Sequence, residues 1–424
     1  MKRPTETMKN NPHLHERRGP GPGGIEVQRR EFLQLTSLAA TSLLCAGRPF
    51  AAEGSVKIKD VRLAKAIEIE TSDGTIGSFV GSSSQDRKTL ETHLPRIREL
   101  LAGKDPRDPA LSGELLWEAI YPGKARLFGE FRDPLAGESI LGKPRNARHT
   151  ATGQVFIAFS TVDNALWDLR GKLQDKPVFQ IMGSAHRDHV PVYWRPGEVG
   201  IEPALAAKKA RAAYDRGYRA QKWYFNNGAK EGEQGFKANV ELVRMLREEL
   251  PGATLMFDNH SIRHSDDVEY SLRLCKAVAP YKPFWIEEPI CPEHLDGYAR
   301  IKGETGLTIA GGEHWYTHWA VKPFLDRKCV DYVQSDPIWC GGISEWLKVC
   351  ELVRQYPGVK VVPHITSPWI AAPHCVASQP ESLCPILEFN SEEGQGGRKV
   401  LEQHMQHQPD GRMVMALPTK AGLT

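Results

Sequence analysis

The sequence predicts an α/β barrel that follows a smaller α+β module. From about residue 188 of the 424-residue chain, eight short apolar runs alternate with helical patterns, which is typical of a parallel sheet. Polar residues end seven of these runs and recur at intervals of roughly 30 residues, the length of one βα unit. Because parallel strands of a barrel end at one mouth, this regularity favours a closed barrel over an open doubly wound sheet, whose glycine-rich fingerprint is missing.

The segment before the barrel, residues 54–187, has a different pattern. VKIKDVRLAKAIEIETSDGTIGSFVG alternates as strands do, and Asp73-Gly74 predicts a hairpin turn. Helical spacing follows in RKTLETHLPRIRELLAG, in GELLWEAIY and in the long GQVFIAFSTVDNALWDLRGKLQ. We therefore expect an α+β domain over 54–187, the barrel over 188–395, and a C-terminal segment, 396–424, that returns to the α+β domain.

The first 53 residues are predicted to be an export leader. Residues 1–24 are polar and rich in Pro, Gly, His and Arg, which is typical of disorder. Arg29 and Arg30 then precede a short apolar stretch and small residues near Ala51, the layout of a twin-arginine signal. The alternative is a buried N-terminal helix. We expect cleavage near Ala51 or Ala52, and a mature protein that is periplasmic or exported and not attached to the membrane.

The composition argues against several other classes of protein. Hydrophobic residues make up 40% of the chain and charged residues 25%, which is ordinary for a globular protein. A net charge of +3, with no long basic run, predicts no nucleic-acid partner. The eight cysteines lack CxxC spacing, so neither a zinc ribbon nor a disulfide framework is expected.

Three acidic residues end consecutive predicted strands: Asp258, Glu287 and Glu313. Neighbouring strands lie about 4.8 Å apart, so three carboxylates at this spacing repel one another unless a positive charge sits between them. Hard divalent cations prefer oxygen ligands, which predicts Mg²⁺ first and Mn²⁺ second. One such acid alone could be a helix N-cap, but three in register indicate a metal site.

The next two strands end in Asp336 and His364. A carboxylate beside an imidazole orients the ring and raises its basicity, as in a general base. Each residue alone could be structural, but the pair, next to the acidic cluster, favours catalysis.

The set QKWYF, FDNH, WIEEP, AGGEH, QSDP, VPHI and ILEF resembles the mandelate racemase/muconate lactonizing enzyme-like branch of the enolase superfamily, over about residues 55–415. STVDNALWDLRGKLQDKPVFQIMG is similar to the segment before the barrel in that family. The resemblance implies a modified TIM barrel, (β/α)7β, with an N-terminal α+β capping domain. It also implies that Asp258, Glu287 and Glu313 bind Mg²⁺, with Glu288 outside the ligand set. Asp336 and His364 would form the dyad that acts as the general base. Lys222 would lie near the substrate carboxylate, and Glu388 would form a hydrogen bond on the side of the developing enolate.

The chemistry that these residues favour is removal of a proton α to a carboxylate. Mg²⁺ and Lys222 would hold the developing negative charge while His364 takes the proton. Tyr224 stands where the racemase branch usually has a second lysine, and a phenol with a pKa near 10 is a poor base, which disfavours two-base racemisation. His260, where many members carry Asn, could protonate a leaving hydroxide, or could be an exposed loop residue. Together these residues predict dehydration of a sugar acid.

Other functions are compatible with the same residues. An epimerase or lactonising enzyme would form the same enolate. A non-catalytic relative that only binds a sugar acid is a third alternative, but binding alone does not need a base such as the Asp336–His364 dyad. Arg195 could bind a distal substrate group or lie on the surface. His314 and His318 are four residues apart, but without the Glu of HExxH a zinc pair is disfavoured. The expected partner is a small-molecule sugar acid, and by analogy with other barrels we expect a homo-oligomer.

Overall fold

The computed structural model describes residues 56–81, 84–120, 151–183, 187, 189–260, 265–366, 370–390 and 403–423. The chain divides into two units, Met1–Glu53 and Gly54–Thr424, and the following concerns the second. The predicted export leader lies outside the described residues. Within the described ranges, every helix is too short or too polar to cross a membrane.

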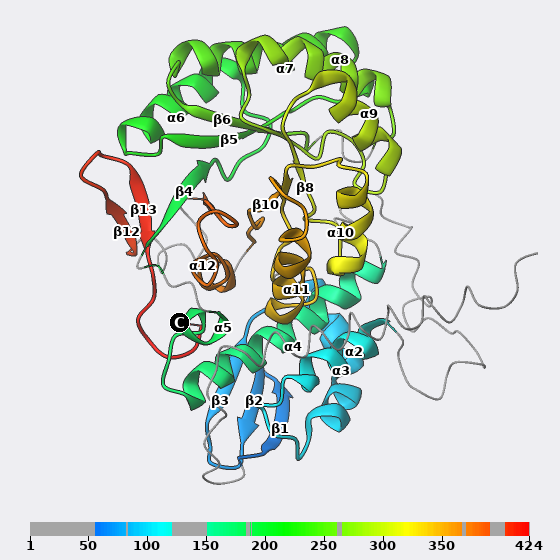
Figure 1. Ribbon diagram of the computed structural model, residues 1–424, viewed down its shortest axis with the longest axis vertical. Helices are drawn as coiled ribbons and strands as arrows, with labels where there is room; N and C mark the ends of the chain where they lie inside the picture. The colour runs from blue at the N-terminus through cyan, green and yellow to red at the C-terminus, as the bar shows by residue number, and fades with distance from the viewer. Residues whose placement is uncertain are drawn as a thin grey trace, which may run out of the picture. The chain divides into compact units, whose positions relative to one another are not determined.

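The N-terminal domain is a three-stranded antiparallel sheet covered by helices (Figure 1). Its strands are β1 (Ile58–Leu63), β2 (Ile67–Thr71) and β3 (Ile76–Phe79), and its helices are α2 (Ser84–Leu101), α3 (Ala110–Ile120) and α4 (Ala151–Leu173), followed by the short α5 (Phe179–Met182). The predicted hairpin joins β2 to β3, where Gly74 has φ +87° and the Thr75 N–H donates to Asp73 Oδ1 at 3.1 Å. A glycine is favoured there because a side chain would strain this left-handed backbone.

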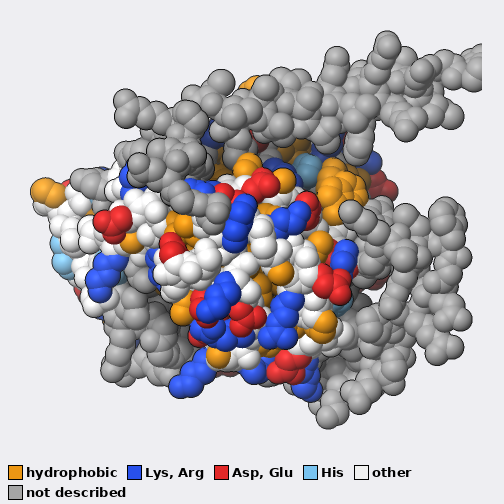
Figure 2. Space-filling view, turned by 90° about the horizontal axis from the view of Figure 1, so that it is seen from below, with side chains coloured by type: hydrophobic (Ala, Val, Ile, Leu, Met, Phe, Trp, Pro, Cys, Tyr) orange, Lys and Arg blue, Asp and Glu red, His pale blue; other side chains and the backbone are white. Residues whose placement is uncertain are grey.

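Acidic and basic side chains are interspersed on the face of the molecule shown in Figure 2. The N-terminal sheet carries ion pairs of this kind, such as Lys59–Glu70 at 2.8 Å and Arg62–Glu68 at 2.6 Å.

The barrel follows the predicted order of strands and helices. Each of the eight apolar runs contains one strand: β4 (His189–Arg195), β5 (Ala220–Tyr224), β6 (Thr254–Asp258), β7 (Ile286–Glu287), β8 (Ile309–Gly311), β9 (Tyr332–Val333), β10 (Lys360–Val361) and β11 (Leu387–Asn390). Neighbours from β4 to β10 pair in parallel, and β11 pairs in parallel with β4.

Helices alternate with these strands: α6 (Pro203–Asp215), α7 (Gly232–Glu249), α8 (Val268–Val278), α9 (Leu295–Thr305), α10 (Thr317–Asp326), α11 (Ile343–Val353) and α12 (Ala371–Ala377). Short 3₁₀ helices cover Ala229–Glu231 and Ala279–Tyr281. Eight strands and seven connecting α-helices within the described ranges confirm the predicted (β/α)7β barrel with its N-terminal α+β domain.

The strand register sets the depth of each site residue in the barrel. Tyr224 pairs with Asp258, and Asp258 pairs with Glu287, so these three lie at one level. Lys222 pairs with Met256, two residues earlier on each strand and therefore one side-chain layer deeper. Met256 belongs to a buried cluster with Tyr193, Trp285, Ala310 and Val362.

The C-terminal segment closes against both parts of the fold. Strands β12 (Met405–His407) and β13 (Met413–Ala416) form an antiparallel hairpin, and β13 pairs with the first residues of β4. Further along the chain, Gly422 forms an isolated parallel β-bridge with Pro177, and the Leu423 N–H donates to Asp168 Oδ1 on α4 at 2.8 Å.

Candidate active site

The three predicted metal ligands lie together at the carboxyl ends of the strands. Asp258 and Glu287 are the last residues of β6 and β7, and Glu313 follows β8. All three are buried, and one oxygen from each lies within 4.8 Å of the others. The register explains this arrangement, because parallel pairing of β6 with β7 places Asp258 directly beside Glu287.

Lys222 places a positive charge among these carboxylates. Its Nζ lies 2.6 Å from Glu287 Oε1, 3.5 Å from Asp258 Oδ2 and 3.4 Å from Glu388 Oε2. Burial by itself would lower the pKa of Lys222, but the surrounding carboxylates, above all Glu287 and Glu388, raise that pKa well above its ordinary value. Lys222 is therefore an ammonium that partly compensates the buried acids from below.

The residues present fit a hard divalent cation. The cluster offers only carboxylate oxygens, the ligand type that Mg²⁺ and Mn²⁺ prefer. Gln334 Nε2 donates to Glu287 Oε2 at 2.7 Å and thereby fixes the orientation of that carboxylate. Such outer hydrogen bonds are typical of built metal sites.

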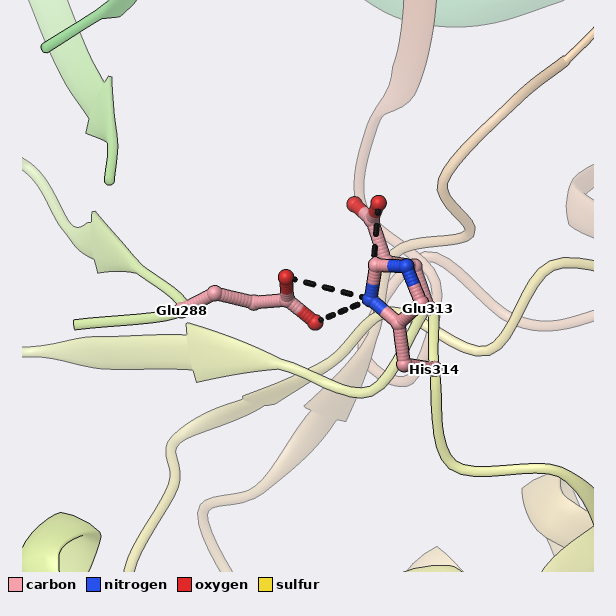
Figure 3. Close-up of side chains that lie close together, drawn as sticks. All are labelled: Glu288, Glu313 and His314. Atoms are coloured by element: carbon pink, nitrogen blue, oxygen red, sulfur yellow. Dashed lines mark hydrogen bonds and ion pairs between the residues drawn. The ribbon is translucent and has the colours of Figure 1, made fainter. Parts of the chain in front are cut away.

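Glu288, Glu313 and His314 form a second group of potential ligands (Figure 3). His314 Nδ1 lies 2.9 and 3.2 Å from the two Glu288 oxygens and 3.7 Å from Glu313 Oε1. Glu288 has φ +40°, an uncommon backbone conformation for this residue type. Because the imidazole and Glu288 are hydrogen-bonded to each other, this group is a carboxylate–histidine pair beside the acidic cluster.

The predicted dyad is assembled. His364 Nδ1 lies 2.9 Å from Asp336 Oδ2, and the Ile338 N–H donates to Asp336 Oδ1 at 2.7 Å. The other ring nitrogen, Nε2, is 3.8 Å from Glu313 Oε2. Burial lowers the pKa of His364, but the charge of Glu313 and the hydrogen bond that the imidazole makes to Asp336 outweigh burial and raise it. The indole of Trp339 packs on the imidazole, with ring centroids 4.7 Å apart.

Glu388 is held as a carboxylate by several donors. Tyr193 OH donates to its Oε2 at 2.9 Å, and Arg195 Nε donates to its Oε1. Burial raises the pKa of Glu388, but the charges of Lys222 and Arg195 outweigh burial and lower it, so the group accepts hydrogen bonds. Arg195 is the last residue of β4 and only 13% of its side chain is exposed, so of the two alternatives for Arg195 the surface position is wrong.

Tyr224 and His260 lie against each other, ring edge to ring face, with centroids 5.2 Å apart. Burial raises the pKa of Tyr224 to about 12, and Arg195 opposes this only in part, so the phenol is neutral at physiological pH. His260 is half-buried, which does not fit the alternative of an exposed loop histidine. His314 faces Glu288 whereas His318 donates its backbone N–H to Glu345 Oε1 at 2.9 Å, so the two histidines have different partners.

The sequence interpretation missed three side chains that contact the site: Tyr193, Gln334 and Trp339. Two of them had a local signal. Gln334 lies two residues before Asp336, and Tyr193 two residues before Arg195, so alternation along a strand places each pair on one face. No local pattern distinguished Trp339 from an ordinary core tryptophan.

Comparison with known proteins identifies the family. The sequence profile of the family described as "Enolase C-terminal domain-like" matches residues 205–424. L-rhamnonate dehydratase from Saccharopolyspora erythraea is 30% identical over 327 residues, which cover 76% of this chain and 72% of that protein.

Two solved structures are similar in fold. The crystal structure of rhamnonate dehydratase from Gibberella zeae complexed with Mg has a TM-score of 0.63 and 26% identity, with 84% of this chain and 78% of that chain covered. The 3,6-anhydro-D-galactonate cycloisomerase from Zobellia galactanivorans has a TM-score of 0.66 and 23% identity, with 87% and 95% covered. Its capped barrel, its acidic cluster and these matches show that the chain belongs to the enolase superfamily, in the branch of mandelate racemase and muconate lactonizing enzyme.

Proposed function

We propose that this protein is a Mg²⁺-dependent sugar-acid dehydratase. One observation carries the proposal: the oriented imidazole of His364 presents Nε2 3.8 Å from Glu313 Oε2, beside the acidic cluster. A base next to a metal site suits removal of a proton α to a carboxylate. The rhamnonate dehydratases among the relatives support elimination of water as the outcome.

In the proposed reaction, His364 removes the α-proton. Asp336 accepts the hydrogen bond from Nδ1, which leaves the Nε2 lone pair to act as the base. Mg²⁺ bound by Asp258, Glu287 and Glu313 would supply positive charge that stabilises the enolate. Lys222 adds its own charge from below the same carboxylates.

The second half of the reaction breaks the bond from the β-carbon to its hydroxyl oxygen. The electron pair of the enolate forms the new double bond, and the leaving hydroxide takes a proton to become water. Tyr224 and His260 are the proposed proton donors, because they lie in contact near the end of β6 and a phenol with a pKa of about 12 carries its proton at physiological pH. The resulting enol becomes a 2-keto acid by proton transfer to carbon.

A screen of sugar acids tests this function. Each acid is incubated with the enzyme and Mg²⁺, and semicarbazide reports the 2-keto product. We expect one or a few acids to react with the wild type and none with His364→Asn. A set of acids that yields C2 epimers without keto product would favour the epimerase alternative, and binding without either product would favour the non-catalytic one.

We also propose that residues 1–53 direct export and that the mature protein acts outside the cytoplasm. The adjacent Arg29 and Arg30 support this proposal. Replacing both with lysine is expected to leave the full-length protein in the cytoplasmic fraction. Export of the double variant at the wild-type level would exclude a twin-arginine signal. The predicted homo-oligomer is tested separately by analytical ultracentrifugation.

A further inference from the structure

The turn between β9 and α11 carries the carboxylate of the dyad. Asp336 accepts backbone hydrogen bonds from Trp339 at 2.9 Å and Cys340 at 2.8 Å, besides the bond from Ile338 to its side chain. The direction of the Asp336 carboxylate therefore depends on the conformation of this turn. The orientation of the His364 imidazole therefore also depends on this conformation, because Asp336 is the hydrogen-bond partner of His364 Nδ1.

Asn164, on helix α4 of the N-terminal domain, joins the two ends of this turn. Its Nδ2 donates to the Pro337 carbonyl at 3.1 Å, directly after Asp336, and its Oδ1 accepts from the Ile343 N–H at 3.0 Å. Asn164 is fully buried, so water does not substitute for either bond. One amide thus fixes the distance between the start of the turn and the start of α11.

Neighbouring residues on the same face of α4 bind the end of the turn and the start of α11. Ser160 Oγ accepts from the Gly341 N–H at 2.9 Å, and Asp163 accepts from the Ser344 N–H at 2.9 Å and the Ser344 hydroxyl at 2.8 Å. A helical repeat places residues 160, 163 and 164 on one side of the helix. Buried polar groups are costly unless they are hydrogen-bonded, and here the partners lie on the turn and in the first residues of α11.

The turn approaches α4 so closely that only glycine fits at its last residue. Gly342 has φ +92°, and a Cβ there would lie 2.4 Å from Asp163 Oδ2. The backbone of the turn and the polar face of α4 are therefore in direct contact at Gly342, with no space for a side chain between them.

We propose that Asn164 is a positioning residue for the Asp336–His364 dyad, and that the polar face of α4 (Ser160, Asp163 and Asn164) holds the base in place from the N-terminal domain. The inference rests on the proposed function, because it assigns the dyad to proton abstraction. It gives the motif STVDNALWDL a role in the chemistry in addition to its role in packing.

Asn164→Asp tests the proposal with a change of one atom. The new carboxylate still accepts from Ile343 but no longer donates to the Pro337 carbonyl. We expect kcat to fall about 10- to 100-fold, the usual range for loss of an outer hydrogen bond that orients a site residue, with KM and Mg²⁺ affinity within about twofold of wild type. The control is Asp168→Asn, since Asp168 is equally buried on α4 but binds Ser78, Lys172 and Leu423 instead of the turn.

The readouts separate positioning from stability. Melting temperature, kcat, KM and exchange of the α-proton with D₂O are measured for both variants, and the proposal predicts that only Asn164→Asp slows exchange. Equal kcat for the two variants would overturn it. If Asn164→Asp does not fold, Ser160→Ala replaces it, with a smaller fall in kcat expected and an unchanged kcat overturning the proposal.

His364→Asn, run in parallel, tells the two possible failures apart. If His364→Asn is inactive and Asn164→Asp is normal, only the positioning role is wrong. If His364→Asn turns over normally, the proposed function is wrong and the inference falls with it.

Discussion

The ammonium of Lys222 lies 2.6 Å from Glu287 Oε1 inside the barrel, and 1% or less of either side chain is exposed. Lys222 comes from one layer below Glu287, so its long side chain reaches up among the carboxylates. A buried ion pair of this kind costs desolvation free energy, but removing one partner leaves an uncompensated charge and costs more.

Lys222→Met is therefore expected to lower the free energy of unfolding by about 3–5 kcal/mol when divalent cations are removed with EDTA. Urea unfolding measures the change. Lys276→Met is the control, because Lys276 pairs with Glu304 at 3.0 Å while 55% and 39% of their side chains are exposed, and such exposed pairs contribute about 1 kcal/mol or less. Equal losses for the two variants would show that Lys222 does not compensate the buried acids.

Glu313 belongs both to the acidic cluster with Asp258 and Glu287 and to the group with Glu288 and His314. Substitutions of residues that belong to only one of the two groups therefore distinguish which group binds the metal. Asp258→Asn removes a ligand from the proposed Mg²⁺ site, and Glu288→Gln instead changes the pair with His314. Titration calorimetry is expected to show Mg²⁺ binding weakened at least tenfold in Asp258→Asn and changed much less in Glu288→Gln. The reverse order would place the ion beside His314.

A pH-dependent contribution to stability is expected at Glu345, in the first turn of α11. Burial raises the pKa of this carboxyl, but hydrogen bonds from His318 and the charge of Lys348 outweigh burial and lower it to about 2. A pKa lowered in the folded state gives stability that is complete above the unfolded value, near 4.5, and is lost as the pH falls toward 2.

Glu345→Gln is expected to reduce the free energy of unfolding at pH 7 by on the order of 3 kcal/mol and to flatten its fall between about pH 4.5 and 2. Urea unfolding at several pH values measures both effects. Glu351→Gln, which breaks an exposed pair with Arg354 on the same helix, is the control and should change stability by about 1 kcal/mol or less. An unchanged pH profile in Glu345→Gln would remove this carboxyl from the acid response.

The barrel was predictable from sequence because its signals are local. Each strand is a short apolar run, and the strand-end position of Asp258, Glu287 and Glu313 follows from the repeat of one βα unit. The register between β5 and β6 was not predictable, so the sequence did not show that Lys222 lies one layer below the acids.

Contacts between segments that are distant in the chain were also not predictable from the sequence. Asn164 and Ile343 are 179 residues apart in the chain and meet only after α4 packs on the barrel. Arg195 and Glu388 are 193 residues apart and meet because β11 pairs with β4. The sequence pattern of each segment is compatible with several packing partners, and only the folded structure selects among them.

The proposed reaction begins when His364 removes an α-proton and ends with the elimination of water. Proton NMR in D₂O, with Mg²⁺ and a sugar acid that the enzyme turns over, follows both steps in one experiment. We predict a 2-keto product without the C2 epimer in the wild type, and neither product nor α-proton exchange in His364→Asn. Turnover of that variant at the wild-type rate would show that His364 is not the base, and a deuterated C2 epimer as the main wild-type product would show that the enzyme is not a dehydratase.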